Sequence, residues 1–178
     1  MVHKGVDLLL EAFVEMPGFQ LTLCGPIEAE QDFVQAYRKE LFETQNIRTI
    51  GWVQLESPEF QQVLNSCSAL VYPSCSEGQS TAVVTALHAG VIPIASYESG
   101  VDIADFGTVL RACSIEEIKE AVRHMAGLSS EELRQRAEAT WKYARAYHTR
   151  EHYAKVYEET VHTILAAHKS RVNAARWG

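Results

Sequence analysis

Residues 69–95 constrain the fold most, because they carry two short apolar runs on either side of a helix signal. The first run, residues 69–72, and the second, residues 91–95, each have the length and composition of a buried strand. Between them the pattern fits a helix that begins at Ser80 or Thr81, both of which are good N-caps. Strand, helix and strand in this order predict a parallel α/β unit.

A polar turn with one acid, Glu77, separates the first of these strands from the helix. In open α/β sheets ligands bind at the carboxyl ends of the strands, and a helix N-terminus favours phosphate. The order of the elements therefore predicts that Glu77 lies at the ligand-binding edge. The alternative interpretation is a solvated turn acid that is stabilised by the helix dipole.

The rest of the chain alternates in the same way. We expect further strands at residues 19–24, 47–53 and 108–110, and helices at residues 6–13, 28–44, 57–64, 114–125, 129–147 and 150–167, with Ser114/Glu117 and Ser129/Glu132 as capping boxes. This alternation predicts an α/β fold with a doubly wound, Rossmann-like parallel sheet. A strand normally precedes such a first helix, and none does, so we expect the chain to be part of a longer protein, cut after its first strand.

At 178 residues the chain suits one domain, predicted over residues 1–168, with a tail at 169–178. The net charge of −7 argues against a nucleic-acid partner, which needs clustered Lys and Arg. No apolar run has the length that spans a bilayer.

Cysteine and histidine residues can bind metal ions, but their spacing in this sequence does not support a metal site. The four cysteines, which include Cys24 and Cys67, form no Cys-x-x-Cys pair, so we expect reduced thiols in or near the core of a cytoplasmic protein. His148 and His152 are spaced to share a helix face, but Thr149 stands where a zinc-binding helix has its Glu. No metal site is predicted.

The turn and helix after residue 72 closely resemble the nucleotide-sugar site of the GT-B glycosyltransferases, in particular family 4. That family's pattern is Pro-Ser, two residues, Glu-Gly, six residues, Glu-Ala, three residues, Gly, two residues, Pro. The residues that match it in register are Pro73, Ser74, Glu77, Gly78, Ala86, Gly90 and Pro93. Thr85 stands where the family has its second Glu. The resemblance covers nearly the whole chain as the C-terminal, donor-binding half of a GT-B fold, without the acceptor-binding domain.

The resemblance implies a role for each matching residue. Glu77 becomes the catalytic residue that contacts the hydroxyls of the transferred sugar, and Lys4 neutralises the diphosphate. Backbone N–H groups at the start of the helix would face the diphosphate oxygens; they belong to Gly78, Gln79, Ser80 and Thr81. The alternatives are that Ser80 only caps the helix and that Lys4 is a solvated terminal lysine.

Three further positions follow from the same resemblance. Gly25 would let the backbone approach the ligand, and Gly51 would border the base together with Trp52, although turn chemistry alone explains both glycines. We expect the Trp52 side chain to pack within the protein and not to stack on the base. At Thr85 the family's Glu holds the ribose, so the threonine makes either a weak ribose contact or none.

The implied function is that of a retaining hexosyltransferase in glycoconjugate or polysaccharide biosynthesis, with a UDP-, GDP- or ADP-linked sugar as substrate and no cofactor or metal. Peripheral membrane contact would come through the absent domain. The isolated chain is expected to be inactive, because it lacks the acceptor side of the cleft. The alternative is a degenerate, non-catalytic binding or scaffolding module, in which Thr85 marks lost donor affinity.

Overall fold

The computed structural model describes the backbone of residues 1–103 and 105–176, and side chains as far as residue 168. The chain divides into two compact units, Met1–Trp141 and Lys142–Gly178, where one domain through residue 168 was predicted. The second unit contains α8 (Arg150–Arg176), which continues as helix through residues 169–176, where a tail was predicted. Large apolar side chains of α8 such as Tyr153 and Ile164 are exposed, so this helix builds no core of its own.

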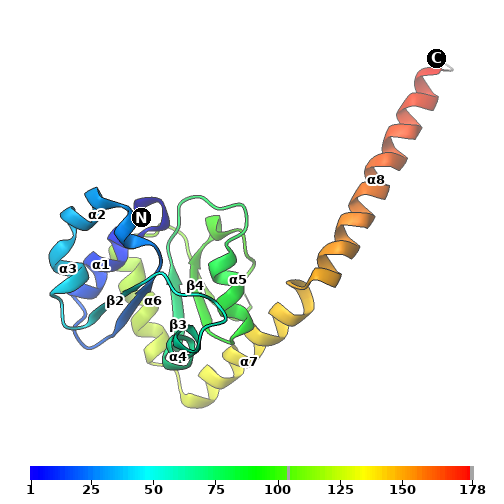
Figure 1. Ribbon diagram of the computed structural model, residues 1–178. Helices are drawn as coiled ribbons and strands as arrows, with labels where there is room; N and C mark the ends of the chain where they lie inside the picture. Colours follow the sequence, from blue (N-terminus) through cyan, green and yellow to red (C-terminus); the bar gives the residue numbers. More distant parts are fainter. Residues whose placement is uncertain (104, 177–178) are drawn as a thin grey trace. The chain divides into compact units, whose positions relative to one another are not determined.

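The strands form two parallel sheets inside the first unit (Figure 1). One sheet pairs β1 (Leu21–Cys24) with β2 (Ile47–Gly51). The other has the order β3 (Ala69–Tyr72), β4 (Ile92–Ser96) and β5 (Thr108–Leu110). The predicted α/β fold with parallel strands is confirmed, but the strands form two sheets and not one, because β1 and β3 are not hydrogen-bonded to each other.

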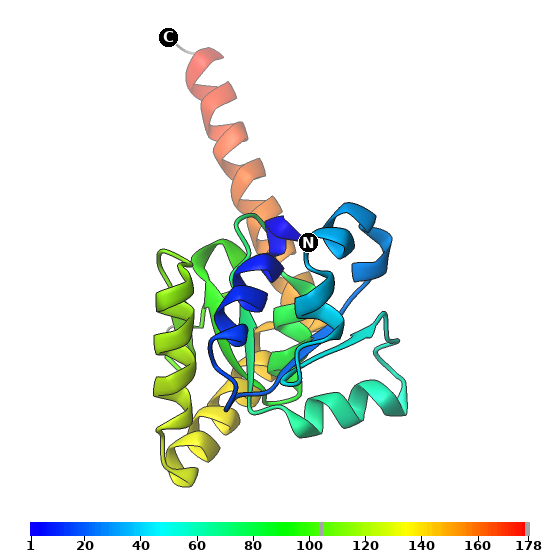
Figure 2. The same cartoon turned by 90° about the vertical axis from the view of Figure 1, so that its left-hand side faces the viewer.

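Helices precede, connect and follow the parallel strands. In chain order they are η1 (Val2–Lys4), α1 (Val6–Val14), η2 (Ile27–Ala29), α2 (Gln31–Ala36), α3 (Arg38–Phe42), α4 (Pro58–Ser66), α5 (Thr81–His88), η3 (Tyr97–Ser99), α6 (Ile115–Ala126) and α7 (Ser130–Tyr147). Helix α1 packs beside α6 (Figure 2), whereas α5 packs on β3 and β4. Leu10 of α1, Ile94 of β4 and Ile118 of α6 are fully buried in one core. Parallel strands need such crossover helices, which bury the strands between them.

The helix expected at residues 28–44 is two helices, α2 and α3, that meet at Tyr37. Tyr37 has φ −111° and ψ 26°, outside the helical range. Its hydroxyl donates a hydrogen bond of 3.0 Å to Glu11 Oε1 of α1, while Phe33 and Leu41 stay buried. The break at Tyr37 lets the hydroxyl reach α1 and still keeps both apolar neighbours in the core.

One of the two predicted capping boxes differs from expectation. Ser129 and Glu132 exchange hydrogen bonds as a capping box does. Ser114 Oγ accepts from Glu117 N, but the Glu117 carboxylate turns to the loop before the helix. It accepts three backbone N–H groups, those of Arg111 (2.7 Å), Ala112 (2.9 Å) and Cys113 (2.8 Å). Glu117 therefore ties the end of β5 to α6.

The expectation that Cys24 lies in or near the core is wrong, because this thiol is exposed. Cys24 ends β1 on the opposite side of the strand from the buried Leu23. Strand alternation sends successive side chains to opposite faces, and the apolar run alone does not say which face is covered. Cys67 is half-buried, in keeping with a near-core thiol.

Candidate donor-binding site

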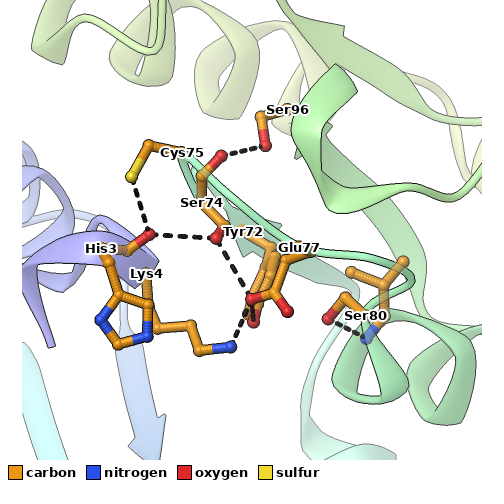
Figure 3. Close-up of polar contacts among 9 residues, drawn as sticks. His3, Lys4, Tyr72, Ser74, Cys75, Glu77, Ser80 and Ser96 are labelled. Atoms are coloured by element: carbon orange, nitrogen blue, oxygen red, sulfur yellow. Dashed lines mark hydrogen bonds and ion pairs between the residues drawn. The ribbon is translucent and has the colours of Figure 1, made fainter.

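The turn between β3 and α5, residues 73–80, is fixed on two sides by other segments (Figure 3). On one side Cys75 N donates to the His3 carbonyl of η1 at 3.0 Å. On the other side Ser96 Oγ donates to Ser74 O at 2.6 Å, and Ser80 N donates to Ser99 O at 2.8 Å. The acidic turn is thus held between the first turn of the chain and the end of β4.

Two glycines allow this close approach. Gly5 has φ +70°, and a Cβ there would lie 2.4 Å from Pro73 O. Gly100 has φ +69°, and a Cβ there would lie 2.2 Å from Gly78 O. Positive φ disfavours other residues, and both separations are far inside van der Waals contact. Each position therefore requires glycine for the turn to keep its shape.

Glu77 is the centre of the polar contacts in this turn. Its Oε1 atom accepts from Lys4 Nζ in an ion pair, from Tyr72 OH at 2.8 Å and from Ser74 Oγ at 3.2 Å. Lys4 Nζ also lies 5.8 Å from the centre of the Tyr72 ring. Figure 3 shows these three side chains converging on one carboxylate oxygen. Among the described residues, no contact to the other oxygen, Oε2, is present.

Lys4 and Glu77 each stabilise the charged form of the other side chain. The hydrogen bond from Lys4 holds the pKa of the Glu77 carboxyl below its ordinary value; partial burial opposes this, and Tyr72 and Ser74 add to it. The same hydrogen bond raises the pKa of the Lys4 ammonium, against the opposing effect of its partial burial. The Glu77 side chain is 14 % exposed and that of Lys4 is 35 % exposed, so a ligand can reach the pair from solvent.

The N-terminus of α5 lies directly after the acidic turn. Ser80 is buried, and its Oγ accepts from Val83 N at 3.4 Å, so the hydroxyl caps the helix as the alternative interpretation proposed. Because the Ser80 N–H group donates to Ser99 O, it is not free for a ligand in this structure. Within the described part of the chain, the N–H groups of Gly78, Gln79 and Thr81 have no hydrogen-bond acceptor.

Thr85 lies one turn further along α5. Its Oγ1 donates to Thr81 O at 2.7 Å, a bond within the helix. The hydroxyl proton is therefore already used. A hydroxyl bonded in this way can still accept a hydrogen bond, but it lacks the charge and the second oxygen of a carboxylate.

The glycines predicted after the first two strands lie together. Gly25 follows β1 and Gly51 ends β2, and Gly25 N donates to Gly51 O at 2.8 Å. A Cβ at either position would meet nothing within 4 Å, so both backbones border open space. Among the described residues, no hydrogen bond links these glycines to the contacts of Glu77. The expectation that Trp52 packs is wrong, because its side chain is 73 % exposed.

Sequence reasoning missed Tyr72 and the segment after β4 that supports the turn. Tyr72 was predicted only as the end of a strand, and no sequence pattern aims its hydroxyl at Glu77. Ser99 and Gly100 carry an ordinary turn signal, which does not reveal the partner they contact. Only the fold brings these segments to the acidic turn.

Two features are absent from the described residues. Side chains of His, Cys, Asp and Glu form no group of three or more there that could hold a metal ion. In the same residues, no helix combines the length and the apolar character needed to cross a membrane.

The sequence of this chain matches a known protein family. The family model described as "Glycosyl transferases group 1" matches residues 1–128. Among proteins with curated functions, none is significantly similar in sequence.

Three of the solved structures with a similar fold are glycosyltransferases or parts of them. A glycosyltransferase from Rickettsia africae has a TM-score of 0.75 at 14 % identity, over 91 % of this chain and 45 % of that one. Anabaena HepE in complex with UDP-glucose has a TM-score of 0.72 at 16 % identity, over 93 % and 46 %. The C-terminal domain of LpcC, a glycosyl transferase group 1 family protein from Francisella tularensis, has a TM-score of 0.66 at 15 % identity, over 84 % and 82 %. The chain spans less than half the length of the first two.

Proposed function

The chain belongs to the group 1 glycosyl transferases, and we propose that its Glu77 turn binds a nucleotide-diphosphate sugar that the whole protein uses to glycosylate an acceptor hydroxyl with retention. The observation that carries this proposal is the ion pair of Lys4 and Glu77 beside the N-terminus of α5. It supplies a cation for the diphosphate and a carboxylate for the sugar at the carboxyl end of β3.

In the proposed complex the diphosphate takes Lys4 from Glu77. A diphosphate carries more negative charge than one carboxylate, so it competes well for a cation that is 35 % exposed. The N–H groups of Gly78, Gln79 and Thr81 and the dipole of α5 add further attraction. Together these groups stabilise the charge that develops on the leaving nucleoside diphosphate, and on this account no metal ion is required.

Glu77 is the proposed contact of the transferred sugar. Because the hydrogen bonds from described residues all use Oε1, Oε2 remains able to accept hydrogen bonds from sugar hydroxyls. A carboxylate whose pKa is held low stays ionised at neutral pH, and charge-assisted hydrogen bonds to sugar hydroxyls are the stronger kind.

The nucleoside would extend toward the ends of β1 and β2. Gly25 and Gly51 border open space there, and the exposed Trp52 offers an aromatic face. Stacking on an aromatic side chain contributes about 1–3 kcal/mol per base. The HepE complexes with UDP and UDP-glucose favour uridine as the first nucleoside to test.

The test is to add UDP, GDP and ADP, and then their sugar conjugates, to the 178-residue chain and to follow thermal unfolding and binding heat. We expect one nucleotide series to raise the melting temperature, since a ligand that binds only the folded state stabilises it. No response to any series at millimolar concentration would contradict donor binding.

Thr85 supports a second candidate, a degenerate module that no longer binds the donor, because its hydroxyl is bonded inside α5. The titration of the wild-type chain separates the two, and the substitution Thr85→Glu tests where the ribose lies. If the ribose lies along α5, the restored carboxylate should tighten binding of both UDP and UDP-glucose about tenfold, the effect of a charged hydrogen bond. Unchanged or weaker binding would show that the ribose lies elsewhere.

Transfer itself is assigned to the whole protein. Both sides of a cleft are needed to orient an acceptor and to exclude water. The isolated chain should therefore bind donor without transferring sugar, and measurable transfer to an added acceptor would overturn this. NMR of a product made by the whole protein would test retention.

A further inference from the structure

Among the hydrogen-bond donors to Glu77 in the described part of the chain, Tyr72 is the one that comes from the sheet. It is the last residue of β3, and its backbone lies in register with Ala95 of β4. Its hydroxyl donates to Glu77 Oε1 at 2.8 Å. This bond ties the acid in the turn back to the strand from which the turn leaves.

The other two donors, Lys4 and Ser74, can each give up the hydrogen bond to Glu77 for another acceptor. Lys4 is the group that the proposed diphosphate removes. Ser74 Oγ lies 3.0 Å from His3 O and 3.2 Å from Glu77 Oε1, and it carries one proton, so it can donate to only one of these acceptors at a time. Tyr72 has no second acceptor among the described residues. It therefore remains bonded to Glu77 when Lys4 turns to a ligand.

We propose that Tyr72 is a positioning residue, which holds Glu77 by Oε1 so that Oε2 faces the sugar of the bound donor. This inference rests on the proposed function. Tyr72 touches neither the sugar nor the diphosphate; it acts only through Glu77. Because one oxygen is fixed by the strand, the rotation of the carboxylate is restricted before the sugar arrives, and less order has to be gained on binding.

The Tyr72 ring also contacts Lys4, and a substitution can remove the hydroxyl without removing this contact. Lys4 Nζ lies 5.8 Å from its centre, within the range of a cation–π contact. The substitution Tyr72→Phe keeps the ring, and with it the contact to Lys4, but removes the hydroxyl. Any effect of this variant then reports on the bond to Glu77.

The experiment compares binding of UDP and UDP-glucose to the wild-type chain and to Tyr72→Phe by calorimetry; if guanosine or adenosine nucleotides are the series that stabilises the chain, that pair is used. We expect UDP-glucose to bind about five- to tenfold more weakly to the variant, and UDP to change by less than about twofold. The matched control is Tyr37→Phe, which removes another Tyr–Glu hydrogen bond, 3.0 Å from Glu11 Oε1, outside the turn. It should change neither affinity.

A second measurement detects positioning without a ligand. The ¹³C shift of the Glu77 carboxyl, followed against pH, should give a higher pKa in Tyr72→Phe than in wild type, because the lost hydrogen bond favoured the charged form. Ser74→Ala should move the Glu77 pKa less, since its proton is shared.

Each outcome decides the role of Tyr72. If wild type binds no sugar nucleotide, the proposed function fails and this role fails with it. If wild type binds but Tyr72→Phe weakens UDP and UDP-glucose equally, or neither, only the role of Tyr72 is overturned. Should Tyr72→Phe fail to fold, Lys4→Met provides the test: with Tyr72 still holding Glu77, the ratio of the UDP-glucose affinity to the UDP affinity must stay as it is in wild type. A fall in that ratio would overturn the inference.

Discussion

Lys4 and Glu77 form an ion pair across 73 positions of sequence, between the end of η1 and the turn that follows β3. The backbone supports the same approach, since Cys75 N donates to His3 O and Gly5 lies against Pro73. The pair is therefore a consequence of how the two segments pack.

Replacing Lys4 by methionine tests its assignment to the diphosphate. Lys4→Met should weaken UDP binding about tenfold, or ~1.4 kcal/mol, because one charge-assisted contact is lost. Calorimetry measures this, with Lys39→Met on α3 as the control for loss of a positive charge. UDP affinity that is the same in Lys4→Met and wild type would remove Lys4 from the site.

Trp52 gives an optical signal for the nucleoside. Its side chain is 73 % exposed after β2, so a stacked base should quench its fluorescence. UDP should quench the wild-type chain, whereas inorganic pyrophosphate, which has no base, should not. Trp52→Phe should abolish the quenching although Trp141 and Trp177 remain. Quenching that survives in Trp52→Phe would mean that the base lies near another tryptophan.

Gly100 should be essential for the shape of the turn. Gly100→Ala brings a Cβ to 2.2 Å from Gly78 O at a φ of +69°, so we expect a loss of at least about 2 kcal/mol in the free energy of unfolding. Urea denaturation measures the loss. Gly18→Ala is the matched control, since a Cβ at Gly18 meets nothing within 4 Å. Equal stability of the two variants would contradict this packing.

Local signals in the sequence predicted the ends of the strand and the helix on either side of the Glu77 turn. Pro73 ends β3 and Ser80 caps α5 as predicted, because strand breaks and helix caps depend on neighbouring residues. The pairing of Lys4 with Glu77, by contrast, depends on the packing of distant segments.

Predictions that depended on which face of a strand or helix is covered by other residues were wrong in some cases. Trp52 was expected to pack and is exposed, because apolarity alone does not show whether a neighbour lies over the side chain. The break at Tyr37 was missed for a related reason: the helical spacing of Phe33 and Leu41 is kept across it. The two-sheet arrangement depends on strand neighbours, which a pattern of alternating elements does not specify.

The Glu117 carboxylate makes the free energy of unfolding depend on pH. Burial raises its pKa, but the three backbone N–H groups together outweigh burial and hold the pKa below the ordinary value of 4.5. The ionised Glu117 carboxylate therefore makes its full contribution to the free energy of unfolding above pH 4.5. This contribution is lost as the pH falls through the lower pKa of the folded state. Glu117→Gln should cost about 1 kcal/mol at pH 7, the low end for bonds near the surface, and should reduce the loss of stability in acid.

Urea denaturation of wild type and Glu117→Gln between pH 7 and pH 3 measures this difference. Glu120→Gln is the control, because Glu120 is exposed on the same helix and makes no hydrogen bond among the described residues. The same acid dependence in Glu117→Gln and wild type would contradict the role of Glu117 as a tie between β5 and α6.

The most direct test of the central claim is the affinity of wild type and Glu77→Gln for UDP-glucose and UDP, measured side by side by calorimetry. Glutamine keeps the size of the side chain but removes the charge that the sugar hydroxyls are proposed to meet. We predict that Glu77→Gln weakens UDP-glucose about tenfold or more, and that UDP binds as tightly or more tightly, because Lys4 is freed for the diphosphate. Equal weakening of both ligands, or no effect on either, would contradict the assignment of Glu77 to the transferred sugar.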